Sequence, residues 1–173
     1  MNILSVDCGT KTGWAFMMDG QIESGTVDFA KRRGESNGSM FLRFNGWLHR
    51  EFHNNLGDLK GKIDLIVYER AHHRGGAATE IGVGMATRVM EFAAYIGAEY
   101  MGVHSATIKK YVTGSGRANK DDMIAWFEKT QNRSPVDDNE ADAMALLYFA
   151  LNEMGEPKPA GHTPKAEIIA YRA

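Results

Sequence analysis

Two short apolar runs in this chain each end in an acidic residue. The first covers residues 3–7 and ends at Asp7, and the second covers residues 63–69 and ends at Glu69. Their Ile, Leu and Val content favours strands buried in the middle of a sheet. A carboxylate at the end of a buried strand is costly unless a cation, hydrogen bonds or a metal ion compensates its charge. An aspartate that caps its own turn is the alternative explanation for Asp7. If the two strands lie side by side in parallel, Asp7 and Glu69 come together.

The order of apolar patterns along the chain predicts one α/β domain. Three strands form an antiparallel meander with a hairpin turn at Asp19-Gly20, and later strands alternate with amphipathic helices. This order indicates a five-stranded mixed sheet, with three antiparallel strands and then parallel crossovers, flanked by helices. The predicted strands are 2–8, 13–18, 21–28, 63–69 and 99–103, and the predicted helices begin near residues 40, 81, 106, 120 and 137 and include 40–54 and 81–96.

Length and composition set the class of protein. With 173 residues the chain suits one domain, predicted over 1–154, followed by a loosely ordered tail over 155–173 that holds three of the four prolines. Cys8 is the only cysteine, so a reducing cytoplasm is the expected location, in a bacterium or in a phage-infected host. No apolar run approaches the ~18 residues of a membrane span, so no membrane partner is expected.

Basic residues are distributed unevenly, although the formal net charge is only -2. They gather at 31–33, 70–74, 109–110 and 117–120. Basic loops around an acidic centre would give this pattern, and an ordinary solvated surface explains any one group equally well.

The start of the last predicted helix is acidic. Asp138 and Asp142 are four residues apart and share a helix face, and Asn139 lies three residues before Asp142. Asp137 and Glu140 have the spacing of a capping box, so a helix-capping role is expected for both. Asp142 begins the apolar stretch of the helix, which predicts that it faces the sheet.

Clustered carboxylates repel one another unless cations lie between them. Mg2+ or Mn2+ is the economical solution, because hard ions prefer oxygen ligands. Two such ions ~4 Å apart support in-line hydrolysis of a phosphodiester. A structural ion-pair network is the alternative, and Lys11 and Lys120 are the available cations.

At these residues the chain resembles the RuvC family of Holliday-junction resolvases, which have the RNase H-like fold. The resemblance covers Met1 to about Leu151 in order and spacing. It implies a homodimeric, Mg2+-dependent endonuclease that nicks four-way or branched DNA, and the compact chain suggests a bacteriophage-type member. Its motifs are the opening 7–15, the strand ending at Glu69, the glycine-containing segment 108–120 and the acidic segment 139–143.

The resemblance also implies roles for individual residues. Asp7, Glu69 and Asp142 match the family's metal-binding acids, and Lys120 matches a basic position of its glycine loop. The family usually has Asp or His three residues before the last acid, where this chain has Asn139, so Asp138 is the alternative fourth ligand. The expected DNA-binding residues are Lys11, Arg70, Arg74, Lys109, Lys110, Arg117 and Lys120, which would hold phosphates.

Other functions remain open at this point. An actin-like kinase also opens with an Asp-Gly-Thr turn, but it needs further motifs that 173 residues do not hold. An RNase H-like nuclease acting on RNA, such as the YqgF group, and a non-catalytic branched-DNA-binding protein are the closer alternatives. His72 and His73 are expected to be ordinary loop histidines.

Overall fold

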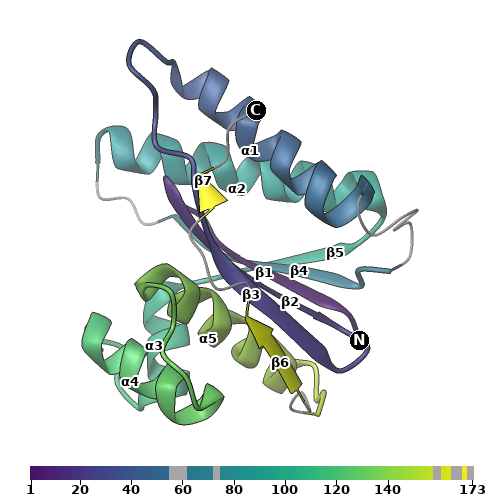
Figure 1. The fold of residues 1–173 in the computed structure, drawn as a ribbon, viewed down its shortest axis with the longest axis vertical. Coiled ribbons are helices and arrows are strands. Elements are labelled where there is room, and N and C mark those ends of the chain that lie inside the picture. Colours follow the sequence, from purple (N-terminus) through teal and green to yellow (C-terminus); the bar gives the residue numbers. More distant parts are fainter. Residues whose placement is uncertain (55–61, 72–74, 158–160, 165–168, 171–173) are drawn as a thin grey trace.

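A mixed β-sheet separates two layers of helices in the computed structural model (Figure 1). The structure describes residues 1–54, 62–71, 75–157, 161–164 and 169–170. Helices α1 and α2 cover one face of the sheet, and helices α3, α4 and α5 lie on the other. No helix within these ranges is long and apolar enough to cross a bilayer.

The sheet has the order β5-β4-β1-β2-β3-β6, and β7 also pairs with β3. Neighbours β1, β2 and β3 are antiparallel, whereas β1–β4 and β4–β5 are parallel. The predicted five-stranded mixed sheet is therefore confirmed, and two short strands from the end of the chain extend it in parallel along β3. The strands are β1 (Ile3–Asp7), β2 (Lys11–Met18), β3 (Gln21–Asp28), β4 (Leu65–Glu69), β5 (Glu99–Val103), β6 (Gly161–Pro164) and β7 (Ile169–Ala170).

The helices follow the predicted order with small shifts at their ends. The predicted helix 40–54 is α1 followed by a π-helical turn, η1, so the α-helical part ends earlier than its apolar pattern does. Gly97 ends α2 in a left-handed conformation, directly after the predicted helix 81–96. The bounds are α1 (Asn37–His49), η1 (Arg50–Asn54), α2 (Ala77–Ile96), α3 (Ser105–Thr113), α4 (Lys120–Gln131) and α5 (Asp138–Glu153).

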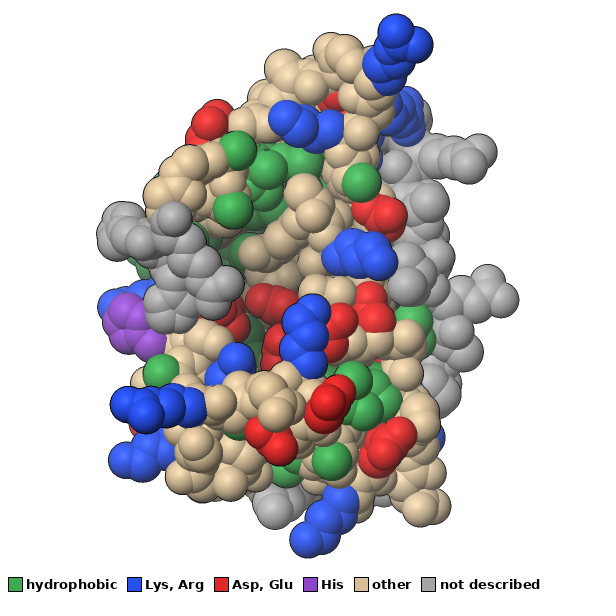
Figure 2. Space-filling view, turned by 90° about the vertical axis from the view of Figure 1, so that its left-hand side faces the viewer, with side chains coloured by type: hydrophobic (Ala, Val, Ile, Leu, Met, Phe, Trp, Pro, Cys, Tyr) green, Lys and Arg blue, Asp and Glu red, His purple; other side chains and the backbone are tan. Residues whose placement is uncertain are grey.

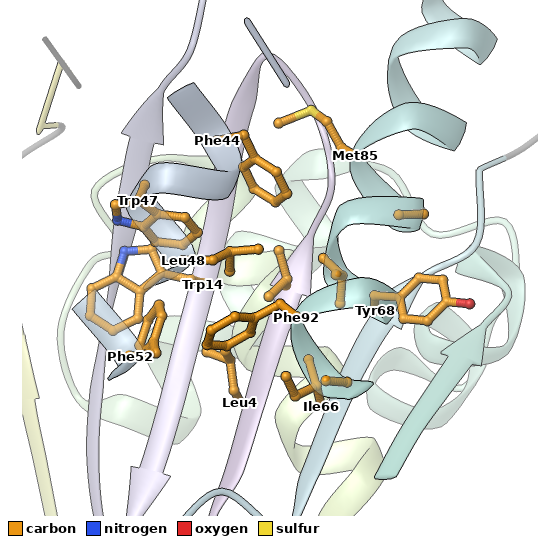
Figure 3. Close-up of a cluster of buried hydrophobic side chains, with 14 of the residues drawn as sticks. Leu4, Trp14, Phe44, Trp47, Leu48, Phe52, Ile66, Tyr68, Met85 and Phe92 are labelled. Carbon is orange, nitrogen blue, oxygen red and sulfur yellow. The ribbon is translucent and has the colours of Figure 1, made fainter. Parts of the chain in front are cut away.

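The sheet divides the buried side chains into two cores. Leu4 and Val6 of β1 point towards α1 and α2, whereas Ile3 points into the core beneath α5, because successive side chains of a strand point to opposite faces. The first core is aromatic (Figure 3), with the rings of Trp14 and Phe52 at 5.6 Å between centroids. The second core includes a row of small and aliphatic side chains from α5. The small residues let α5 lie close to β1 and β2.

Candidate active site

The carboxyl ends of β1 and β4 place two acids side by side. The two strands are parallel and in register from Ile3 opposite Leu65 to Val6 opposite Tyr68. Asp7 and Glu69 are the next residues on the two strands, so both lie at the carboxyl ends of neighbouring strands. This is the arrangement that the apolar runs predicted.

Helix α5 crosses the sheet at this edge and supplies the remaining acids. Ser5 of β1 is fully buried, and its one hydroxyl proton is shared between the carbonyl oxygens of Ala143 at 2.8 Å and Ala15 at 3.1 Å. This pair of hydrogen bonds ties the first turns of α5 to β1 and β2. Asp138 and Asp142, one helical turn apart, are therefore held close to the strand ends.

The N-terminus of α5 is capped by Asp137. Its Oδ1 accepts hydrogen bonds from the backbone N–H groups of Asn139 and Glu140, both at 3.1 Å, and from the hydroxyl of Thr26 on β3 at 2.6 Å. The side-chain amide of Asn139 donates to Asp137 Oδ2 at 2.9 Å. The predicted capping role of Asp137 is confirmed, and the amide of Asn139 is turned towards the cap.

Glu140 has a larger role than the capping box predicted for it. The residue is fully buried, and its carboxylate accepts hydrogen bonds from the Ser24 hydroxyl and the Val136 backbone N–H, both at 2.6 Å. It also forms an ion pair with Arg133 at 2.6 Å. The guanidinium of Arg133 in turn lies over the Phe127 ring, 4.6 Å from its centroid. Glu140 therefore joins β3 and the segment between α4 and α5 to α5 itself, instead of completing the cap.

The acids influence one another electrostatically. Burial raises the pKa of Asp7 well above its ordinary value, and the negative charges of Glu69, Asp142 and Asp138 raise it further. Burial, followed by Glu69, raises the pKa of Asp142 to about 7. Figure 2 shows acidic side chains gathered in a hollow in the middle of one face, with lysine and arginine side chains beside them. The four predicted acids thus form one cluster.

Two of the predicted basic residues face this cluster. Lys120 forms an ion pair with Asp138, and that partner raises the pKa of the lysine. The positive charge of the half-buried Lys109 opposes the effect of burial on Asp142. Either lysine could also hold a phosphate next to the acids.

The other predicted DNA-binding residues lie elsewhere on the surface or beyond the described part. Arg70 packs its Cγ beside Gly102 of the edge strand β5. Lys11, Lys110 and Arg117 are exposed, and no ion pair with the acidic cluster is found for them in the part of the chain that the structure describes. Arg74, His72 and His73 lie outside the described residues.

The acids have the chemistry of a hard-metal site. Asp7, Glu69, Asp138 and Asp142 offer carboxylate oxygens, the ligands that Mg2+ and Mn2+ prefer, and their mutual repulsion favours a cation between them. As the side chains stand, no three His, Cys, Asp or Glu residues within the described ranges are grouped closely enough to hold a metal ion. The oxygen donors of these four acids fit a divalent cation.

Comparison with known proteins identifies the fold. No protein-family model and no curated protein matches the chain. Among solved structures, Thermus thermophilus RuvC matches with a TM-score of 0.68 and 17% sequence identity, covering 92% of this chain and 99% of that one. A structure of T. thermophilus RuvC in complex with a Holliday junction substrate matches with the same values. The predicted RNase H-like fold is confirmed.

Proposed function

We propose that this protein is a divalent-metal-dependent endonuclease that cleaves branched DNA, with four-way junctions as its main substrate. The observation that carries the proposal is the convergence of Asp7, Glu69, Asp138 and Asp142 at one sheet edge, with Lys109 and Lys120 next to them. The likeness of the fold to T. thermophilus RuvC, including its complex with a Holliday junction substrate, supports the choice of substrate.

Each group in the site has a distinct task under this proposal. Asp7, Glu69, Asp138 and Asp142 would hold one or two Mg2+ or Mn2+ ions, which when bound would activate water and stabilise the leaving oxygen. Lys109 and Lys120 would each contact a phosphate of the backbone, which positions DNA without reading its sequence. Ser5, Asp137 and Glu140 hold the first turns of α5 and so orient two of the acids.

A homodimer is part of the same proposal. Two copies related by a two-fold axis would present two acidic sites to two strands of matching polarity, which is the symmetry needed to resolve a junction symmetrically. A bacteriophage-type origin and a cytoplasmic location remain predictions of the sequence.

A single substrate panel tests the function. Equal amounts of a four-way junction, a replication fork, a linear duplex and an RNA–DNA hybrid are incubated with the protein, with Mg2+ and with a chelator. We expect paired nicks in the junction that require the metal ion. Cleavage confined to the hybrid would favour an RNA-directed nuclease, and binding of the junction without nicks under any metal would favour a non-catalytic binder.

Alanine at Arg117 or Lys120 should weaken binding of all branched DNAs and reduce the salt dependence of that binding.

A further inference from the structure

One cation already lies against the acidic cluster, and it belongs to the protein. The ammonium group of Lys120 contacts Asp138 Oδ2 within ion-pair distance. The Lys120 side chain is 76% exposed, whereas that of Asp138 is 26% exposed. The lysine therefore reaches inwards from solvent to a carboxylate at the rim of the cluster.

The backbone that carries Lys120 is fixed, so only the side chain has freedom to exchange partners. Lys120 is the first residue of α4, directly after the N-cap Asn119. Asn119 Oδ1 accepts from the Asp122 N–H at 3.0 Å, and Asp122 Oδ2 accepts from the Asn119 N–H at 2.9 Å. Ala118, which precedes Asn119 in the chain, is buried. Rotation about the side-chain bonds of Lys120 is thus enough to release Asp138.

Asp138 is the acid of the cluster that Lys120 engages. The neighbouring amide of Asn139 is bonded to Asp137, so Asp138 is the carboxylate that α5 can add to Asp142. While the ion pair lasts, Oδ2 of Asp138 is directed at the ammonium group of Lys120. An exposed ion pair contributes little to stability, so a competing anion or cation can replace either partner.

We propose that Lys120, while paired with Asp138, keeps this carboxylate from binding a second metal ion. A DNA phosphate releases the carboxylate by binding the lysine in its place. This inference rests on the proposed function and adds to it an order of assembly. Lys120 exchanges Asp138 for a phosphate oxygen, and the released Asp138 carboxylate turns to the divalent cation. Because linkage is reciprocal, DNA tightens metal binding by the factor by which the metal tightens DNA binding.

Metal binding tests the exchange without relying on cleavage. Free Mn2+ is measured by electron paramagnetic resonance during titration of the wild type, Lys120→Met, Lys120→Arg and Lys129→Met, each with and without a four-way junction carrying phosphorothioate linkages that resist hydrolysis. Lys129→Met is the matched control, because it removes the same charge from an exposed position in the last turn of the same helix, α4. Thermal melting of each variant checks that it is folded.

We expect Lys120→Met without DNA to bind its weaker Mn2+ ion about two- to fivefold more tightly than the wild type, and Lys129→Met to match the wild type. Junction DNA should tighten Mn2+ binding in the wild type and in Lys120→Arg but not in Lys120→Met. Unchanged or weaker Mn2+ binding by Lys120→Met, or equal tightening by DNA in both proteins, would overturn the exchange. The wild type separates this failure from failure of the proposed function. If the exchange is overturned but the wild type still binds Mn2+ and cuts the junction, only the exchange is rejected. If the wild type binds no Mn2+ and cuts no junction, the proposed nuclease function fails as well.

Discussion

A Cβ atom built on Gly13 would lie 1.8 Å from the carbonyl oxygen of Asn139 and 2.3 Å from its carbonyl carbon. No real Cβ atom comes so close to a backbone atom, so β2 and the first turn of α5 touch directly, backbone against backbone. This contact sets how near Asp138 and Asp142 come to the strand ends. Gly13 in the second strand is therefore needed for the position of a helix that begins more than 120 residues later.

Gly13→Ala should push α5 away from the sheet, because the added Cβ would collide with backbone atoms of Asn139 and no flexible side chain can move aside instead. We expect the free energy of unfolding to fall by about 2–3 kcal/mol and metal-dependent cleavage to be lost. Urea unfolding of the metal-free protein measures the first effect. Gly38→Ala is the control, since its nearest neighbour would be Ser36 Oγ at 3.6 Å and a helical alanine is favoured by roughly 0.5–1 kcal/mol. A Gly13→Ala protein of unchanged stability would show that α5 does not rest on β2.

Glu140→Ala should be among the most damaging substitutions outside the acidic cluster. It leaves the Arg133 guanidinium, the Ser24 hydroxyl and the Val136 N–H without their shared acceptor. We expect a loss of about 3–5 kcal/mol in urea unfolding. Glu91→Ala breaks the exposed ion pair with Arg88 and should cost less than about 1 kcal/mol. Similar small losses for both variants would mean that the buried pair has no special structural role.

Asp7→Asn tests the centre of the site. The substitution keeps the shape of the side chain and removes one negative charge that faces Glu69 and Asp142. Cleavage of a four-way junction in Mg2+ should fall below detection, while junction binding should be equal or tighter because repulsion of phosphate decreases. Asp19→Asn, at the exposed hairpin turn, should cleave like the wild type. Normal cutting by Asp7→Asn would remove the basis for the nuclease assignment.

The stability of the metal-free protein should depend on pH through Asp142. Its pKa of about 7 lies above the ordinary value of 3.8, so the folded state favours the protonated form. The contribution of Asp142 to stability is therefore highest below about pH 4, decreases as the pH rises to 7, and stays low above that value. With a chelator present at pH 8, Asp142→Asn should raise the free energy of unfolding by ~1–3 kcal/mol, and the gain should vanish near pH 4. A gain that is the same at both pH values would contradict the ionised, repelled state of Asp142.

Asp138→Asn and Asn139→Ala identify the fourth ligand. The amide of Asn139 donates to the cap residue Asp137, whereas Asp138 faces Lys120 at the cluster. Asp138→Asn should strongly reduce cleavage, and Asn139→Ala should keep most of it while losing about 1 kcal/mol of stability with the lost hydrogen bond. Initial cleavage rates at several Mn2+ concentrations provide the comparison. Full activity in both variants would mean that neither residue completes the site.

The sequence was sufficient to predict the strand order and the acids at the strand ends, because alternation of buried apolar runs with helices leaves few topologies. The sequence was not sufficient to predict the buried hydrogen bonds and the ion pair of Glu140. An acid three residues after an N-cap has the pattern of a solvated capping box, and only the folded chain brings Ser24 and Arg133 to it. The pairing of Lys120 with Asp138 was equally hidden, since it joins the starts of two different helices. The strands β6 and β7 pair with β3, and the sequence of the tail does not indicate which strand they would join.

The side chains of β1 point alternately into the two cores, and this separation has a practical consequence for engineering. Substitutions that improve packing around Phe44 and Met85, on the α1 and α2 side, reach the acidic cluster only through the sheet itself. Effects at well-separated sites usually add. A directed-evolution library restricted to the aromatic core on the α1 and α2 side should therefore yield more thermostable variants with unchanged metal affinity. A library in α5 would alter both thermal stability and metal affinity.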